Sequence, residues 1–226
     1  MQILRGHWQL IILIGLVFAF WQTPFIVPLK ILIVFLHEFS HAAMTVLTGG
    51  DVLSLTISAD QGGEVWSRGG NRFLTLSAGY LGSLLIGLAL LLAATRSHAD
   101  RVIMGVFGAL MFLVTMLYIR DSFAIMFCVG AGVVMLLTAR FLPHDVNDLI
   151  LRMIGLTSMV YVPYDIFSDT IARSALRSDA RMLAEEFGGA TILWGGMWLV
   201  ISLAVIGLSL WRGMGRSSNI TFRRTA

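Results

Sequence analysis

Long apolar stretches follow one another along this chain and constrain its fold more than any other feature of the sequence. A helix needs about twenty mostly apolar residues to cross a bilayer, and about seven windows meet or approach that length. The predicted spans are Trp8–Gln22, Phe25–Leu47, Phe73–Ala94, Val102–Ile119, Ser122–Thr138, Leu149–Phe167 and Thr191–Trp211. Since 57% of the 226 residues are hydrophobic and the mean hydropathy is +0.84, an integral, multi-pass membrane protein is predicted.

The charged residues and the cysteine count limit the partners and the kind of metal site. The 16 basic and 13 acidic residues are scattered between the apolar runs without a basic face, which excludes nucleic acid and leaves the lipid bilayer as the surroundings. For a bacterial chain that bilayer would be the cell membrane. With a single cysteine, Cys128, neither an internal disulfide nor a cysteine-based zinc site is expected, so any metal must be held by histidine and carboxylate.

The first apolar run is interpreted as a span and not as a secretory signal peptide. No small-x-small cleavage site follows it, and apolar character resumes at once after Gln22, Thr23 and Pro24. The loops between the spans are short, so residues 1–226 are predicted to form one integral membrane domain.

The first of two longer polar intervals has the pattern of a β-hairpin. Aliphatic residues alternate there with hydroxyl residues, namely Leu53, Leu55 and Ile57 with Ser54, Thr56 and Ser58. A turn at Gln61-Gly62-Gly63 leads to a return strand at Glu64–Ser67. The fold class is therefore an all-α polytopic membrane protein of about six to seven transmembrane helices, with a short β-hairpin at about 51–68 between the second and third spans.

The second polar interval begins near Asp169 and ends near Gly188. Ser178-Asp179 provides a helix cap, residues 180–187 are good helix formers, and two glycines then stop the helix. A short amphipathic surface helix is predicted here.

The strongest chemical motif lies within the second span, at His37-Glu38-Phe39-Ser40-His41. Positions four apart share one face of a helix, so His37 and His41 can both point at one tetrahedral metal ion. Glu38 emerges beside them, where it can take a proton from a metal-bound water and pass it to a leaving amine. Ionisable groups inside an apolar span usually mark a functional site, so a Zn²⁺ site with Glu38 as general base is predicted.

A catalytic zinc site needs a third protein ligand from elsewhere in the chain. Asp165 is the predicted ligand, because Pro163 is expected to break the sixth span, about 149–167, and let the carboxylate face inward. Asp169, one turn further on, is the alternative. The three histidines outside the motif lie at or beyond the predicted ends of spans.

The chain resembles the site-2 protease family of intramembrane zinc metallopeptidases, in particular small members without a peptide-binding domain. The matching segments are His37–His41 with Ala42-Ala43, Thr48-Gly49-Gly50, Gly62-Gly63, Ala78-Gly79-Tyr80-Leu81-Gly82, Tyr164-Asp165 and Ser178-Asp179-Ala180. The resemblance implies that His37 and His41 bind zinc, that Glu38 is the general base and that a late intramembrane aspartate completes the site. It also implies that the hairpin receives an unwound substrate as an added strand.

One departure from the family pattern concerns the third ligand. Better-known members supply it from an Asp-Gly motif, whereas Ile166 follows Asp165 here. The expected function is an intramembrane zinc metalloendopeptidase that cuts a membrane-protein or membrane-anchored peptide substrate in or near a transmembrane segment. The alternatives are a catalytically inactive peptidase-like membrane regulator and a transporter that uses the His/Asp site as an ion path.

Overall fold

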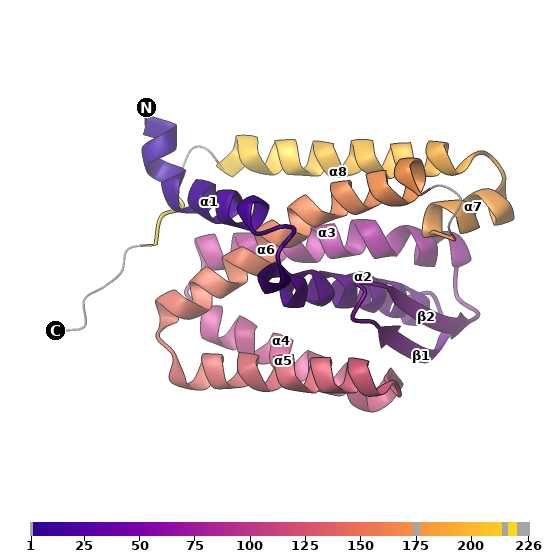
Figure 1. The fold of residues 1–226 in the computed structure, drawn as a ribbon, viewed down its shortest axis with the longest axis horizontal. Helices are drawn as coiled ribbons and strands as arrows, with labels where there is room; N and C mark the ends of the chain where they lie inside the picture. Colours follow the sequence, from indigo (N-terminus) through magenta and orange to yellow (C-terminus); the bar gives the residue numbers. More distant parts are fainter. Residues whose placement is uncertain (1, 174–176, 214–216, 221–226) are drawn as a thin grey trace.

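The fold is known from a computed structural model that describes residues 2–173, 177–213 and 217–220 (Figure 1). Eight α-helices and one two-stranded sheet are found among these residues. In chain order they are α1 (Gln2–Ala19), α2 (Val27–Leu47), β1 (Asp51–Ile57), β2 (Gly63–Arg68), α3 (Arg72–Arg96), α4 (Asp100–Tyr118), α5 (Ser122–Phe141), α6 (His144–Phe167), α7 (Asp179–Phe187) and α8 (Thr191–Gly213). The predicted helical membrane fold with a hairpin after the second span is confirmed.

Six helices in the described part of the chain are long and apolar enough to cross a membrane, namely α2 together with its preceding 3₁₀ turn, α3, α4, α5, α6 and α8. The predicted first span falls short of that length. Helix α1 ends at Ala19, and its apolar part, Arg5–Ala19, is only a short apolar helix. A turn follows in which the Thr23 hydroxyl donates to the Phe20 carbonyl, and Pro24 then opens the 3₁₀ turn.

The membrane helices differ in how deeply they are buried. Of the most apolar stretch of each helix, 67% is buried inside the protein in α2 and 61% in α6. The corresponding shares are 28% in α5 and 17% in α8. Figure 1 accordingly shows α8 along one side of the bundle and α4 with α5 along the other, with α2, α3 and α6 between them. The apolar outer faces of α5 and α8 are therefore the surfaces suited to lipid.

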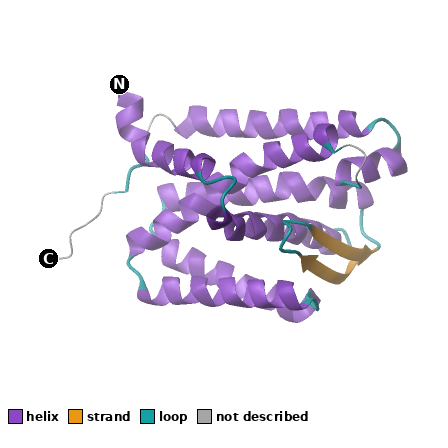
Figure 2. Ribbon diagram, viewed as in Figure 1, coloured by secondary structure: helices purple, strands orange, loops and turns teal. Residues whose placement is uncertain are grey.

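The hairpin lies against α2, at the same end of the bundle as α7 (Figure 2). Strands β1 and β2 pair antiparallel, with Leu55 opposite Val65 and an irregularity between Val52 and Ser54. Leu55 and Ile57 are buried, but Leu53 is 59% exposed. The predicted alternation thus holds only beyond the irregularity, because a shift in register moves the preceding side chains to the other face.

Small residues let α3 approach its neighbours closely. A Cβ atom at Gly87 would lie 2.5 Å from the Ser158 side chain of α6. The Ser158 hydroxyl also donates to the Ser83 carbonyl at 2.8 Å. The small residues Ser83 and Gly87 of α3 thus serve helix packing, as is common in membrane helices.

Helix α6 does not break at Pro163, contrary to the sequence-based expectation. It runs through this residue to Phe167 and continues as a π-helix over Ser168–Ala172. Membrane helices tolerate an internal proline when neighbouring groups compensate for the lost hydrogen bond. The predicted surface helix is confirmed as α7, which the Ser178 side chain caps by accepting from the Arg181 amide. It ends at Phe187 and is followed by Gly188, whose φ is +83°.

Candidate metal centre and catalytic carboxylate

The histidine pair lies in the middle of α2, the most buried of the membrane helices. His37 and His41 are one turn apart, their ring centroids are separated by 4.7 Å, and their Nε2 atoms lie 3.0 Å from each other. Both imidazoles therefore aim one nitrogen at the same point, as the helical spacing predicts.

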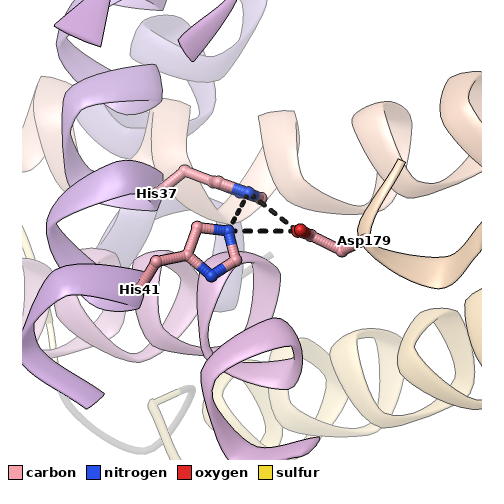
Figure 3. A group of neighbouring side chains, drawn as sticks. All are labelled: His37, His41 and Asp179. Atoms are coloured by element: carbon pink, nitrogen blue, oxygen red, sulfur yellow. Dashed lines mark hydrogen bonds and ion pairs between the residues drawn. The ribbon is translucent and has the colours of Figure 1, made fainter. Parts of the chain in front are cut away.

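The third group at this point is Asp179, the first residue of α7. Its Oδ2 atom lies 3.1 Å from His37 Nε2 and 3.2 Å from His41 Nε2 (Figure 3). Among the described residues, these three form the only group of histidine, cysteine or acidic side chains close enough to share a metal ion. The Ser178 cap fixes the start of α7 and hence the position of the neighbouring Asp179.

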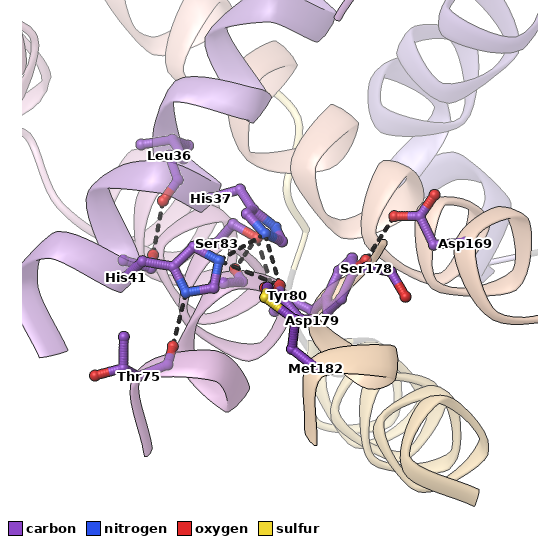
Figure 4. A network of polar contacts seen from close by, with 12 residues as sticks. Leu36, His37, His41, Thr75, Tyr80, Ser83, Asp169, Ser178, Asp179 and Met182 are labelled. Carbon is purple, nitrogen blue, oxygen red and sulfur yellow. Dashed lines mark hydrogen bonds and ion pairs between the residues drawn. The ribbon is translucent and has the colours of Figure 1, made fainter. Parts of the chain in front are cut away.

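The hydrogen bond of His41 on the side away from Asp179 leaves its other ring nitrogen available to a cation. Its Nδ1 atom lies 2.7 Å from the Thr75 carbonyl oxygen, which can only accept, so Nδ1 carries the proton (Figure 4). In the neutral imidazole Nε2 is then a bare acceptor, and it faces the acceptor Oδ2 of Asp179. Lone pairs that converge in this way repel each other unless a proton or a metal ion lies between them, and two imidazoles and a carboxylate offer that place to a metal ion.

The distances within the group suit zinc. In a tetrahedral site with bonds of about 2.0–2.1 Å, the ligand atoms are about 3.3 Å apart. The three separations between His37, His41 and Asp179 are 3.0, 3.1 and 3.2 Å. Two imidazoles and one carboxylate are also a donor set that zinc accepts, with a fourth position left open.

The charge state of Asp179 fits the same interpretation. Burial alone would raise the pKa of this carboxyl group, but His41 and His37, when they carry a proton on Nε2, outweigh burial and hold the pKa well below its usual value. The carboxylate is consequently ionised at neutral pH, the form in which it can bind a metal.

Glycine is required at position 79 of α3, which lies against the histidine pair. A Cβ atom there would overlap the Nε2 atoms of both His37 and His41. The absence of a side chain therefore keeps open the space where a metal ion would lie.

Glu38 lies beside the metal group and faces the first residue of β2. It is 6% exposed, and a Cβ atom at Gly63 would be only 2.5 Å from its Oε1 atom. No hydrogen bond or ion pair engages its carboxylate within the described ranges. Glu38, His37, His41 and Asp179 all line one cavity of about 890 Å³, which β2 borders on one side. A buried carboxylate that opens into this cavity is free to exchange a proton with a bound water or substrate.

The structure does not bring the predicted third ligand to the histidines. Asp165 lines the cavity but is not part of the metal-binding group, whose acid is Asp179. The alternative, Asp169, accepts hydrogen bonds from the Tyr80 hydroxyl at 2.6 Å and from Arg173 at 2.7 Å. Because α6 continues through Pro163, both carboxylates stay on that helix and its π-helical extension, while α7 delivers Asp179.

Sequence reasoning missed Asp179 as a metal-binding candidate because the Ser178-Asp179 pair already fits the start of a helix. The available signal is Ser178-Asp179-Ala180, one of the segments on which the family resemblance rests. The cap and the metal-facing carboxylate prove to be adjacent residues, Ser178 for the cap and Asp179 for the carboxylate. A residue that caps the start of a helix also fixes the position of the residue that follows it.

The fold and this site define an integral membrane protein that carries a His–His–Asp group and a catalytically suited glutamate in one cavity. The sequence model of the Peptidase M50B-like family matches residues 10–209. The chain belongs to this family, and its resemblance to the site-2 proteases is thereby confirmed. No curated protein and no solved structure matches it.

Proposed function

We propose that this protein is an intramembrane zinc metalloendopeptidase that hydrolyses a peptide bond in or near a transmembrane segment. The observation that carries the proposal is the convergence of three metal-binding atoms, from His37, His41 and Asp179, beside the unpaired carboxylate of Glu38. Membership of a peptidase family supports the same reaction class. The role of the third ligand passes in this proposal from Asp165 to Asp179.

The three side chains His37, His41 and Asp179 would hold the zinc ion. Zinc bound there supplies Lewis acidity and makes water nucleophilic near neutral pH. Glu38 accepts the proton of the attacking water and later returns it to the amine of the leaving product. Its burial and its contact with Gly63 hold the carboxylate at the edge of the cavity where β2 begins.

The hairpin offers a docking site for the substrate. Strand β1 packs with Leu55 and Ile57 into the core, whereas Gly63–Ser67 of β2 line the cavity. The sheet has two strands in the described part of the chain, so the outer edge of β2 has backbone groups available for a third. A transmembrane helix must unwind before its peptide bonds can be attacked, and strand addition would satisfy the exposed backbone.

Zinc content and cleavage of a model transmembrane substrate by purified wild type and Glu38→Gln test the proposal. We expect about one zinc per chain in both proteins, and cleavage slower by about 100- to 10,000-fold in the variant. Zinc-free wild type would contradict the metal centre. Full cleavage by Glu38→Gln would contradict the role of the base, and ion flux in vesicles without any cleavage would favour a transporter.

A further inference from the structure

The two histidines of the metal group are held in different ways. His41 donates from Nδ1 to the Thr75 carbonyl, which is the usual means of fixing the ring of a metal-binding histidine. No such partner for Nδ1 of His37 exists among the residues that the structure describes. On the Nδ1 side, the orientation of the His37 ring therefore depends on the side chains packed against it.

Tyr80 lies where it can orient this ring. Its ring meets the His37 imidazole edge to face, with centroids 4.6 Å apart and an angle of 80° between the planes. This is a favourable geometry for two aromatic rings. Tyr80 follows directly after Gly79, the residue whose missing side chain lets α3 approach the histidine pair.

Tyr80 is itself fixed from two other elements. It is 2% exposed, and Trp198 of α8 packs on it with a centroid distance of 5.4 Å. Its hydroxyl donates to Asp169 Oδ2 at 2.6 Å (Figure 4). The other oxygen of Asp169 accepts from Arg173 at 2.7 Å. The tyrosine ring is therefore confined to one orientation.

The π-helix Ser168–Ala172 places Asp169 in this network. The next residue, Thr170, is 3% exposed and packs so closely on Gly195 of α8 that an added Cβ atom would overlap it. Isolated π-helical turns are frequent at functional sites, where they redirect a side chain. Here the turn is anchored to α8 on one side and directs Asp169 toward Tyr80.

We propose that Tyr80 is a positioning residue for the metal centre. It holds the His37 ring so that Nε2 faces the metal, and Asp169 with Arg173 holds Tyr80 in place. Asp169 thus acts on the site through Tyr80 and is not a metal ligand. The inference rests on the proposed zinc peptidase, because it assigns these residues to the same metal centre.

The test uses the full chain in detergent and two measurements that do not depend on cleavage. One is the rate at which zinc is lost to an excess of chelator. The other is the visible absorption spectrum of the cobalt-substituted protein, which reports the ligand geometry. Tyr80→Leu removes the aromatic contact and Tyr80→Phe only the hydroxyl, while Tyr118→Leu at the end of α4 is the matched control.

Tyr80→Leu is expected to lose zinc about 10- to 100-fold faster than wild type and to shift the cobalt spectrum. Tyr80→Phe, which retains the ring and is the safer variant for folding, is expected to lose zinc a few-fold faster. Tyr118→Leu should behave as wild type. Unchanged zinc loss and an unchanged spectrum in both Tyr80 variants would overturn the inference.

Two Asp169 variants separate positioning from metal binding. Asp169→Asn keeps an oxygen that can accept from Tyr80, so it should retain zinc nearly as wild type does. Asp169→Ala should lose zinc at the same rate as Tyr80→Phe. The double variant with both of these substitutions should lose zinc no faster than either single variant. Loss of zinc from Asp169→Asn would make Asp169 a ligand and overturn the inference, whereas wild type without zinc would overturn the proposed function itself.

Discussion

The Oδ2 atom of Asp179 lies 3.1 Å from the Nε2 atom of His37, although 142 positions separate these residues in the chain. The contact joins the start of a short polar helix to the middle of the most buried membrane helix. Because the site joins residues of α2 and α7, its geometry depends on the packing of α7, which contacts α3 and α8.

Asp179→Asn should abolish tight zinc binding. The substitution keeps the size of the side chain but removes the anionic ligand, so we expect zinc affinity to fall by at least about 100-fold. Zinc content after dialysis checks this. Asp165→Asn, in the same cavity, is the matched control and should retain zinc, and the reverse pattern would restore Asp165 as the ligand.

Gly79→Ala should destroy the metal site although alanine favours a helix over glycine by about 1 kcal/mol. Its Cβ atom would overlap the Nε2 atoms of both histidines. Loss of zinc together with an intact circular dichroism spectrum is the expected result. Gly130→Ala in α5 is the control, because an added Cβ atom there meets nothing within 4 Å. Normal zinc content in Gly79→Ala would show that the site is wider than described.

Gly63→Ala should impair cleavage without removing zinc. The added Cβ atom would lie 2.5 Å from Oε1 of Glu38 and displace that carboxylate, while the three metal-binding side chains lie elsewhere. A misplaced general base can slow a reaction by about 100-fold. The measurement is the cleavage rate at a fixed zinc content. Gly62→Ala, whose Cβ atom would meet only the Ser58 hydroxyl at 3.3 Å, should be nearly normal, and equal rates in both variants would contradict the placement of Glu38.

Removal of zinc should lower the stability of the wild-type protein. A bound zinc ion would tie α2 to α7 through side chains whose ligand atoms lie 3.1 and 3.2 Å apart. Free zinc at 100 times its dissociation constant would stabilise the folded state by about 2.7 kcal/mol. Thermal unfolding with and without chelator measures the difference. Asp179→Asn should show almost no effect of chelator, and a wild type that is equally indifferent would argue against a bound metal.

Local features of the sequence were sufficient for much of the structure. The apolar runs predicted the membrane helices, since a run long enough to span a bilayer needs no tertiary context to be recognised. Spacing alone placed His37 and His41 on one face of α2. The hairpin and the capped helix α7 were also predicted, because alternation and capping depend only on neighbouring residues. The structure differs from the sequence-based expectation by only a few residues at the end of α1 and at the irregularity before Ser54.

The third member of the metal group was decided by tertiary structure. Asp165, Asp169 and Asp179 are all acids near the end of the same region, and nothing local distinguishes which one reaches the histidines. The outcome depends on α6 continuing through Pro163 and on α7 packing back across α3. Which aspartate lies close to the histidines depends on distances between elements that are far apart in the chain. Sequence patterns describe only residues that are close together in the chain. The sequence therefore determined the histidine pair and its neighbouring glutamate, and the packing of α6, α7 and α8 determined which aspartate lies beside the histidines.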